Sequence, residues 1–310
     1  MTASRLMQRC LLNALVAAGI AMLPACEFLY PTLRVGPPPP YFGAFRTFND
    51  PQPPQQGLAL WVEGDSLTPD AQGRVAAWPD MRPGGPTLQA WSAHDGRVLS
   101  GTIARATLRT PIGLSRMFSA LQCADPPRCS YALVGAARSD LLTGSPYVIL
   151  AVVRRAGPRG DNYVVMTGGA GCDRITGIRC NDNTALHLGW SGERTLRLGQ
   201  YGNDVTYDNV PAFNAAAPAL SLLEGLSDSG GKRVALLEPL FDASPTSADA
   251  RPLDRSGNVF VGGTPFVDNN SVPNWHFEGV IFAVLIYNVQ MTPAQLQGAA
   301  DYLRNRYGPR

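Results

Sequence analysis

Charged residues are scarce in this sequence, and their signs nearly balance. Only 16% of the 310 residues are Asp, Glu, Lys or Arg, and the formal net charge at pH 7 is +2. Removal of the first 25 residues takes away Arg5 and Arg9 and no acidic residue, which leaves 24 basic and 24 acidic side chains. A neutral chain without a cluster of Lys or Arg lacks the electrostatic footprint of a nucleic-acid-binding protein. The sequence therefore predicts no nucleic-acid partner.

The sequence also lacks the common catalytic signatures. It contains no Gly-x-Ser-x-Gly nucleophile elbow, no His-Glu-x-x-His metal motif and no phosphate-binding loop. The nearest approach to an elbow, from Gly189 to Glu193, has its second glycine one position too early. We therefore assign no catalytic residue from these motifs.

Histidine is rare, with three residues far apart in the sequence, at His94, His187 and His276. His276 follows Trp275 directly before a predicted strand, so it either lines a pocket at the rim of the fold or is simply packed. His187 falls inside a predicted strand, where a core position is expected.

No run of about 20 apolar residues occurs, which is the length that spans a bilayer. The apolar stretch from Leu11 to Leu23 follows two arginines, as in a signal peptide, which we place at residues 1–25. The segment Leu23-Pro24-Ala25-Cys26 resembles the lipobox of bacterial lipoproteins, with Pro24 as an unusual residue, and implies lipid attachment at Cys26. Ordinary signal cleavage is the alternative. The sequence thus predicts an exported, membrane-anchored lipoprotein that faces the periplasm or the cell surface.

Six cysteines are present, of which Cys10 is removed with the signal peptide and Cys26 carries the lipid. The other four form two close couples, Cys123 with Cys129 and Cys172 with Cys180. Four cysteines allow three pairings, and local pairing is favoured because each couple closes a short loop that contains Pro or Gly. A metal site is the competing interpretation, but the spacings are not those of zinc knuckles.

Glycine and proline are abundant, at 32 and 27 residues, and 45% of the chain is apolar. This composition is typical of an exported protein that is rich in turns and strands. Residues 26–56 contain the run Pro37 to Pro40 and a second proline cluster near residue 53. Because proline favours extended backbone, we interpret this segment as a semi-rigid linker.

Short apolar runs separated by turn residues begin at Gly57, and their spacing indicates one β-sandwich or barrel that reaches residue 310. The predicted strands are 58–64, 73–80, 101–110, 130–138, 146–155, 162–169, 184–191, 194–202, 232–241, 257–263 and 277–288. The runs at 146–155 and 277–288 are apolar on both faces, which predicts central strands. The run at 194–202 alternates, which predicts one face in water.

A single helix is predicted at the end of the chain. Thr292 and Gln295 form a capping box, and Pro293 suits the first helical position. An apolar stripe then runs from Leu296 to Tyr307, and Gly308 ends the helix. The helix should therefore pack with one face on the sandwich.

These residues resemble a known family. The opening LALW strand, Trp78 with Asp80 before a Gly-rich turn, the VFVGG strand, and above all the stretch from Phe277 to Gly308 are similar to laminin G-like domains of the concanavalin A-like lectin/glucanase superfamily. The resemblance implies an all-β jelly-roll sandwich of two antiparallel sheets over residues 57–310, with a short C-terminal helix as a clasp. It places ligand sites in rim loops or on the concave sheet.

The enzymes of that superfamily that cut β-glucans resemble one another in a strand with Glu-x-Asp-x-(x)-Glu, because one carboxylate attacks or stabilises the anomeric carbon and another donates a proton. The nearest match here is Glu63-Gly64-Asp65, which lacks the third acid. We interpret it as the turn at the end of a strand. The missing motif favours a binding module over a hydrolase.

The resemblance also raises calcium binding at the rim, since Ca²⁺ prefers oxygen ligands. Two polar runs provide such oxygens, one with Asp182 and the other with Asp268, Asn269 and Asn270. The alternative is that these runs simply form turns, because Asp and Asn side chains mimic backbone turn hydrogen bonds.

Exposed aromatic side chains stack on sugar rings, which makes Trp91, Trp190 and Trp275 of interest, with His276 beside the last. Trp61 and Trp78 are expected in the core. We therefore predict a binding module for glycans or for protein partners at the bacterial envelope. A glycan hydrolase with a non-standard site and a purely structural envelope lipoprotein are the alternatives.

Overall fold

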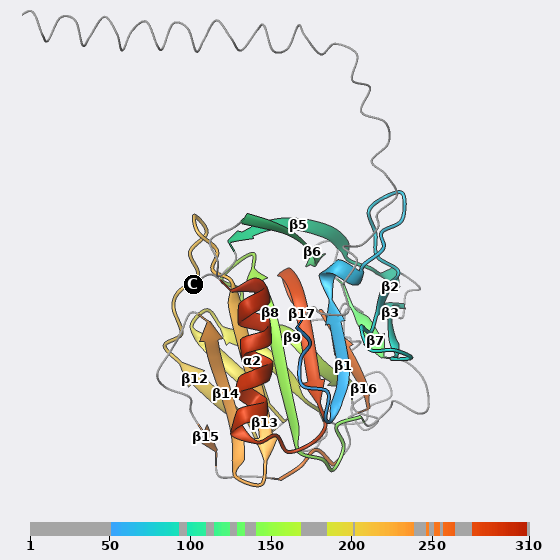
Figure 1. Cartoon of the computed structure of the whole chain (residues 1–310). Helices are drawn as coiled ribbons and strands as arrows, with labels where there is room; N and C mark the ends of the chain where they lie inside the picture. Colours follow the sequence, from blue (N-terminus) through green and yellow to red (C-terminus); the bar gives the residue numbers. More distant parts are fainter. Residues whose placement is uncertain are drawn as a thin grey trace, which may run out of the picture. The chain divides into compact units, whose positions relative to one another are not determined.

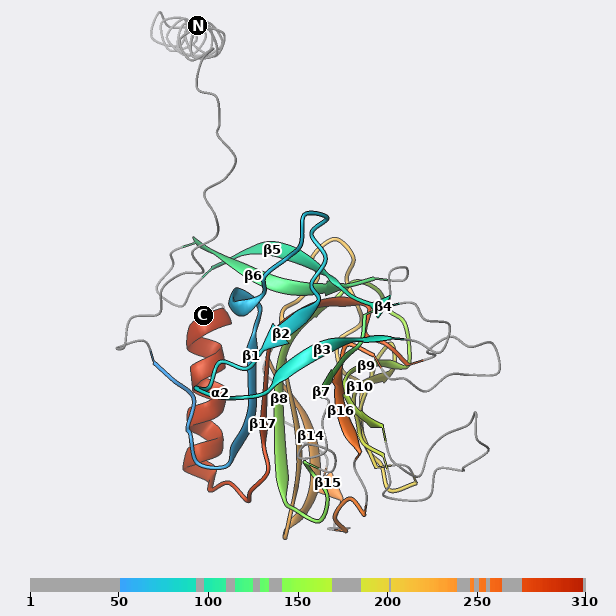
Figure 2. The ribbon, with the colours of Figure 1, turned by 90° about the vertical axis from the view of Figure 1, so that its right-hand side faces the viewer.

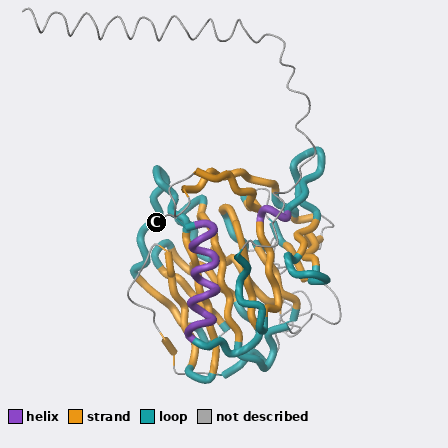
Figure 3. Tube along the Cα trace, viewed as in Figure 1, coloured by secondary structure: helices purple, strands orange, loops and turns teal. Residues whose placement is uncertain are grey.

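The computed structural model describes most of the chain from residue 51 onward, within one compact unit, Arg46–Arg310. The described residues are 51–92, 98–109, 115–124, 129–133, 141–168, 185–200, 202–238, 246–247, 251–254, 257–263 and 275–308. Strands make up most of them (Figure 3). No helix formed by these residues has the length and apolar character needed to cross a bilayer.

The strands form two antiparallel sheets that pack face to face, as predicted for a jelly-roll sandwich (Figures 1 and 2). The first sheet contains, in spatial order, β15 (Thr246–Ser247), β14 (Gly231–Glu238), β13 (Ser221–Asp228), β8 (Tyr147–Arg155), β17 (Gly279–Tyr287), β6 (Ser115–Cys123) and β5 (Thr102–Arg109), with β1 (Leu58–Glu63) also paired to β17. The second contains β12 (Val205–Asp208), β11 (Thr195–Gly199), β10 (His187–Gly192), β9 (Asn162–Gly168), β16 (Asn258–Val261), β7 (Tyr131–Leu133), β3 (Thr87–Ser92) and β2 (Ala77–Pro79), with β4 (Val98–Leu99) paired to β3.

The two apolar runs seen in the sequence are central strands, which confirms that prediction. β8 and β17 pair along most of their length and are buried almost throughout. Both faces are covered because one faces the second sheet and the other faces the C-terminal helix α2 (Pro293–Tyr307). β11 alternates as predicted, with Leu196 and Leu198 in the core between the sheets and Arg197 half-buried on the opposite face.

One edge of β17 is shared by two strands. β6 pairs with Gly279 to Ile281, and β1 pairs with Ala283 to Tyr287, with an irregularity in register between them. The short 3₁₀ helix η1 (Gly64–Ser66) therefore crosses directly over β6. A Cβ at Gly64 would lie 2.0 Å from the carbonyl oxygen of Ser119, so this close approach requires glycine.

The helix α2 begins and ends as the sequence predicts. The Thr292 hydroxyl accepts a hydrogen bond from the Gln295 backbone N–H, and the Gln295 side-chain oxygen accepts one from the Thr292 backbone N–H. Its buried residues are Ala299, Ala300, Tyr302, Leu303 and Tyr307. They pack on the outer face of the first sheet, where Figure 1 shows α2 lying along the strands.

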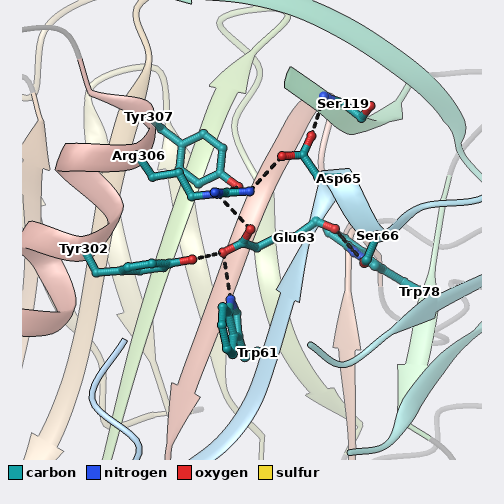
Figure 4. A network of polar contacts seen from close by, with 9 residues as sticks. All are labelled: Trp61, Glu63, Asp65, Ser66, Trp78, Ser119, Tyr302, Arg306 and Tyr307. Carbon is teal, nitrogen blue, oxygen red and sulfur yellow. Dashed lines mark hydrogen bonds and ion pairs between the residues drawn. The ribbon is translucent and has the colours of Figure 1, made fainter. Parts of the chain in front are cut away.

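A buried carboxylate fastens α2 to β1 (Figure 4). Glu63, which is fully buried, accepts a hydrogen bond from the Trp61 indole at 2.8 Å and another from the Tyr302 hydroxyl. Its second oxygen pairs with Nε of Arg306 at 2.8 Å. Arg306 also reaches Oδ2 of Asp65 at 2.8 Å. We call these five residues the β1–α2 clasp.

Glu63-Gly64-Asp65 is thus the turn at the end of β1, as predicted, and its two carboxylates have structural partners. The other oxygen of Asp65 accepts from the Ser119 backbone N–H at 3.0 Å, which ties β6 to the same cluster. The Glu63 backbone carbonyl accepts from the Trp78 indole at 2.8 Å. Trp61 and Trp78 are both buried, which confirms their predicted core positions.

Cys123 and Cys129 form a disulfide, which confirms the local pairing predicted for this couple. The bond joins the end of β6 to the residues that precede β7, so it links the two sheets. Cys26, Cys172 and Cys180 lie outside the described residues.

Substitution Glu63→Gln should lower the free energy of unfolding by about 3 kcal/mol, because it removes one partner of a buried ion pair. The matched control, Thr292→Ala, removes only the helix cap and should cost about 1 kcal/mol. Urea unfolding followed by tryptophan fluorescence measures both. A Glu63→Gln protein no less stable than the Thr292→Ala protein would contradict the importance of the clasp.

Candidate functional site

The outer face of the second sheet, which points away from the core, carries a continuous ladder of cross-strand neighbours. Leu188 and Trp190 of β10 belong to the core, so His187 and Gly189 must face outward, because side chains alternate along a strand. The outward ladder crosses six strands through Gln89, Ala132, Phe260, Met166, His187 and Gly199. Figure 2 shows this sheet on the side of the sandwich opposite α2.

Three rings meet on this face, which we call the aromatic cluster. The Tyr163 and His187 ring centroids lie 4.6 Å apart, and Trp275 lies 6.1 Å from Tyr163 and 5.7 Å from His187. Tyr163 and His187 are buried, whereas Trp275 is half-buried. Trp275 therefore presents part of its surface to the solvent.

The His187 ring fits because the residue opposite it has no side chain. Gly199 is the direct cross-strand partner of His187. A Cβ at Gly199 would lie 1.9 Å from Nε2 of His187, which is an impossible contact. Glycine at this position therefore lets the imidazole lie over the neighbouring strand.

Charged groups surround the aromatic cluster. Arg197, two residues from Gly199 on the same face, lies 3.5 Å from the Asp204 carboxylate, and the side chains are 33% and 27% exposed. The Tyr163 hydroxyl donates to Oδ1 of Asp161 at 3.1 Å. Asp161 adopts a positive φ of 51°, which is uncommon for a residue other than glycine. One cation and two carboxylates thus lie close to the three rings.

The imidazole of His187 is neutral at physiological pH. Burial lowers its pKa to about 4, while Asp204 and Asp161 oppose that shift. Its Nδ1 is buried and has no hydrogen-bond partner among the described residues. Burial likewise raises the pKa of Tyr163, so its hydroxyl stays protonated and can donate.

The arrangement is suited to binding a polar ligand that has an apolar face. Trp275 is partly exposed and offers ring surface to a ligand, and Arg197 and Asp204 offer hydrogen-bond donors and acceptors near it. Within the described part of the chain, no group of three or more His, Cys, Asp or Glu residues is placed to hold a metal.

The structure brings one sequence-predicted ligand residue into this cluster and places two others elsewhere. Trp275 is in the cluster. His276, directly after it, is fully buried and forms a β-bridge with Gly263, so its ring is enclosed. Trp190 is only 1% exposed, and the expectation of an exposed ring is wrong because β10 continues to Gly192 and directs Trp190 inward.

The predicted calcium ligands Asp182, Asp268, Asn269 and Asn270 lie outside the described residues, as does His94. His187 is buried as expected, but on the outer face of its sheet.

Sequence reasoning did not single out Tyr163, Arg197, Asp161 or Asp204. Alternation in the run 194–202 could have placed Arg197 on an outward face, but its neighbours depend on strand register.

Comparison with known proteins gives distant structural neighbours. No protein-family model and no curated protein matches the sequence. Domain 4 of AbnA, a GH43 extracellular arabinanase from Geobacillus stearothermophilus in complex with arabinotriose, has a TM-score of 0.46 and 19% identity over 78% of this chain and 98% of that domain. Trypanosoma rangeli sialidase in complex with sialic acid has a TM-score of 0.42 and 12% identity over 82% of this chain.

The Ruminococcus gnavus IT-sialidase CBM40 bound to α2,3 sialyllactose has a TM-score of 0.36 and 13% identity over half of this chain. This chain spans 34% of the length of the T. rangeli sialidase. Since these scores and identities are low, we take the site from this chain's own geometry.

Protonation of His187 should destabilise the fold in acid. The unfolded chain takes up this proton near pH 6.5 and the folded chain near pH 4, so the unfolded state binds more protons between these values. The free energy of unfolding should therefore fall by about 3 kcal/mol as the pH drops through this window. Urea unfolding across the window measures the effect. A His187→Gln protein, in which Asp161 and Asp204 are unchanged, should show a shallower decline, and an equal decline in both proteins would contradict this role.

Proposed function

We propose that this protein is a glycan-binding module and that the ligand lies on Trp275 beside the Arg197–Asp204 pair. The observation that carries the proposal is the half-exposed Trp275 ring, held by Tyr163 and His187 next to one cation and two carboxylates. A sugar ring has an apolar face of C–H groups and a rim of hydroxyls. An aromatic surface with charged hydrogen-bonding groups at its edge matches both.

Rigidity of the site supports this proposal. Tyr163 and His187 are buried under Trp275, and Tyr163 is further fixed by its hydrogen bond to Asp161. A ring that is already held in place loses little conformational freedom when a ligand binds. The resemblance to laminin G-like domains implies ligand sites in rim loops or on the concave sheet, and we propose that the outer face of the second sheet takes this role.

Binding is favoured over hydrolysis by the way the chain uses its glucanase-like carboxylates. Glu63 is fully buried, and both Glu63 and Asp65 are engaged by Arg306 in the β1–α2 clasp. A carboxylate that holds a helix in this way is not accessible to a glycosidic bond. We therefore propose no catalytic residue.

Substitution Trp275→Ala should weaken glycan binding about five- to tenfold, because stacking on an aromatic ring contributes about 1 to 1.5 kcal/mol. A glycan array identifies the ligand, and titration calorimetry then compares the variants, in calcium and again in EDTA. Arg197→Gln should also weaken binding. Trp91→Ala is the matched control, since Trp91 is half-buried on the same face but packs on Phe260 instead.

Undiminished affinity in Trp275→Ala would overturn this site. Loss of binding in EDTA would support the calcium ligands proposed at Asp182, Asp268, Asn269 and Asn270. Absence of binding to any glycan, in either buffer, would overturn the glycan-binding proposal and leave a protein partner at the envelope as the alternative.

We further propose that the protein acts at the bacterial envelope, exported and anchored through a lipid on Cys26, with residues 26–56 as a linker. The support is the apolar stretch before a lipobox-like segment. A semi-rigid, proline-rich linker of this kind would hold the sandwich some distance off the membrane.

Metabolic labelling with an alkyne fatty acid in a bacterial host should label the wild-type protein and the Cys10→Ala control. The Cys26→Ala protein should carry no label, because it lacks the acceptor thiol. Equal labelling of the Cys26→Ala protein, or no labelling of the wild type, would contradict lipidation at Cys26. The second result would favour ordinary signal cleavage.

A further inference from the structure

A small pocket opens between the two sheets at the end where β10 turns into β11. It has a volume of about 60 Å³ and lies under the loop 210–219. Its wall combines one guanidinium with aromatic and aliphatic groups. The principal lining residues are Arg155, Trp190, Val210, Phe213, Ser221 and Leu236.

The guanidinium of Arg155 is held in this pocket by two rings. Its central carbon lies 4.5 Å from the centroid of the Trp190 ring and 5.8 Å from that of Phe213. Its Nη1 donates to the backbone carbonyl of Glu193 at 3.1 Å. The side chain is therefore positioned by contacts that leave most of its five N–H donors unused.

Arg155 is buried without an ion-pair partner among the described residues. The residue is 8% exposed, and among the described residues no carboxylate lies within ion-pair distance of it. Burial lowers its pKa to about 10, with the Glu193 charge opposing that shift, so the side chain still carries its proton at pH 7. A buried cation without an anionic partner is costly, and an anion in the pocket would relieve that cost.

The pocket also has the size of one small anionic group. A cavity of about 10–15 Å³ holds one water molecule, so this pocket has room for several. A carboxylate group fits in that space. Trp190 and Phe213 would flank the carboxylate, while the fork of the guanidinium matches its two oxygens.

We propose that the Arg155 pocket binds the carboxylate of a small acid, either a free organic acid or an acidic sugar. The pocket is separate from the aromatic cluster. Trp190 points into the core side of β10, whereas His187 lies on its outer face. This proposal therefore goes beyond the proposed function and does not depend on it.

The test follows the Trp190 indole N–H signal by NMR while a carboxylate is added at constant ionic strength and pH. The probes are sodium acetate, sodium glucuronate and, as a neutral sugar, glucose, with sodium chloride as the salt control. A Trp190→Phe protein assigns the signal. Acetate or glucuronate should shift it saturably, and glucose and chloride should not. Saturation by acetate would identify a free acid as sufficient, and saturation by glucuronate alone would identify an acidic sugar.

The Arg155→Met protein keeps the apolar stem and removes the charge, so carboxylate affinity should fall at least about tenfold. The matched control is Arg154→Met, since Arg154 lies over Phe282 on the opposite face of β8. Phe213→Ala removes one wall of the pocket and should also weaken carboxylate binding. Because Phe213 is a partly exposed loop residue, this variant serves as the test if the Arg155→Met protein does not fold.

Absence of a saturable shift with both carboxylates, or equal affinity in the Arg155→Met and wild-type proteins, would overturn the proposal. Binding of neutral glycans to the aromatic cluster is measured in the same Arg155→Met protein. Neutral-glycan binding should persist in the Arg155→Met protein. A failure of the carboxylate-binding proposal is therefore distinguishable from a failure of the proposed function.

Discussion

The arrangement of the sandwich depends on the hydrogen bonds and the ion pair that the buried Glu63 carboxylate makes. A carboxylate out of water is costly unless donors surround it, and here Trp61, Tyr302 and Arg306 provide them. The clasp fixes α2 over the outer face of the first sheet, and it also fixes β1 along the edge of β17. Because that sheet is covered on both sides, its central strands can be apolar throughout. The partly exposed Arg197 and Asp204 lie at the outer face of the second sheet, where we propose that a ligand binds.

The sequence was most informative where local pattern and tertiary role agree. The two apolar runs are central strands, and Thr292 with Gln295 begins the helix as predicted. β13 was missed, because Glu224 interrupts its apolar run. That residue is tolerated since Arg233 of the adjacent strand donates to it at 2.6 Å. The compensating partner is known only once β13 and β14 are paired in register.

The prediction of the site was limited by strand boundaries and by register. The glycines around Trp190 indicated an exposed turn, but β10 includes them, and alternation then directs Trp190 inward with Leu188. The aromatic cluster depends on a further fact, that His187 lies opposite Gly199. The sequence does not reveal that His187 and Gly199 are cross-strand partners, because that pairing depends on the register of two short strands. Trp275 was predicted because a tryptophan next to a strand end is informative by itself.

Arg155 differs from the two buried glutamates in having no ion-pair partner among the described residues. Glu63 and Glu224 are each buried and each paired with an arginine, Arg306 and Arg233, so this fold does satisfy charges that it removes from water. Arg155 is also buried, with 8% exposed, yet its hydrogen-bond and ring contacts among the described residues are a carbonyl and two aromatic rings. Cation–π contacts stabilise a guanidinium without neutralising it. This contrast supports our proposal that Arg155 binds an anionic ligand, whereas the charges of the clasp are paired with one another.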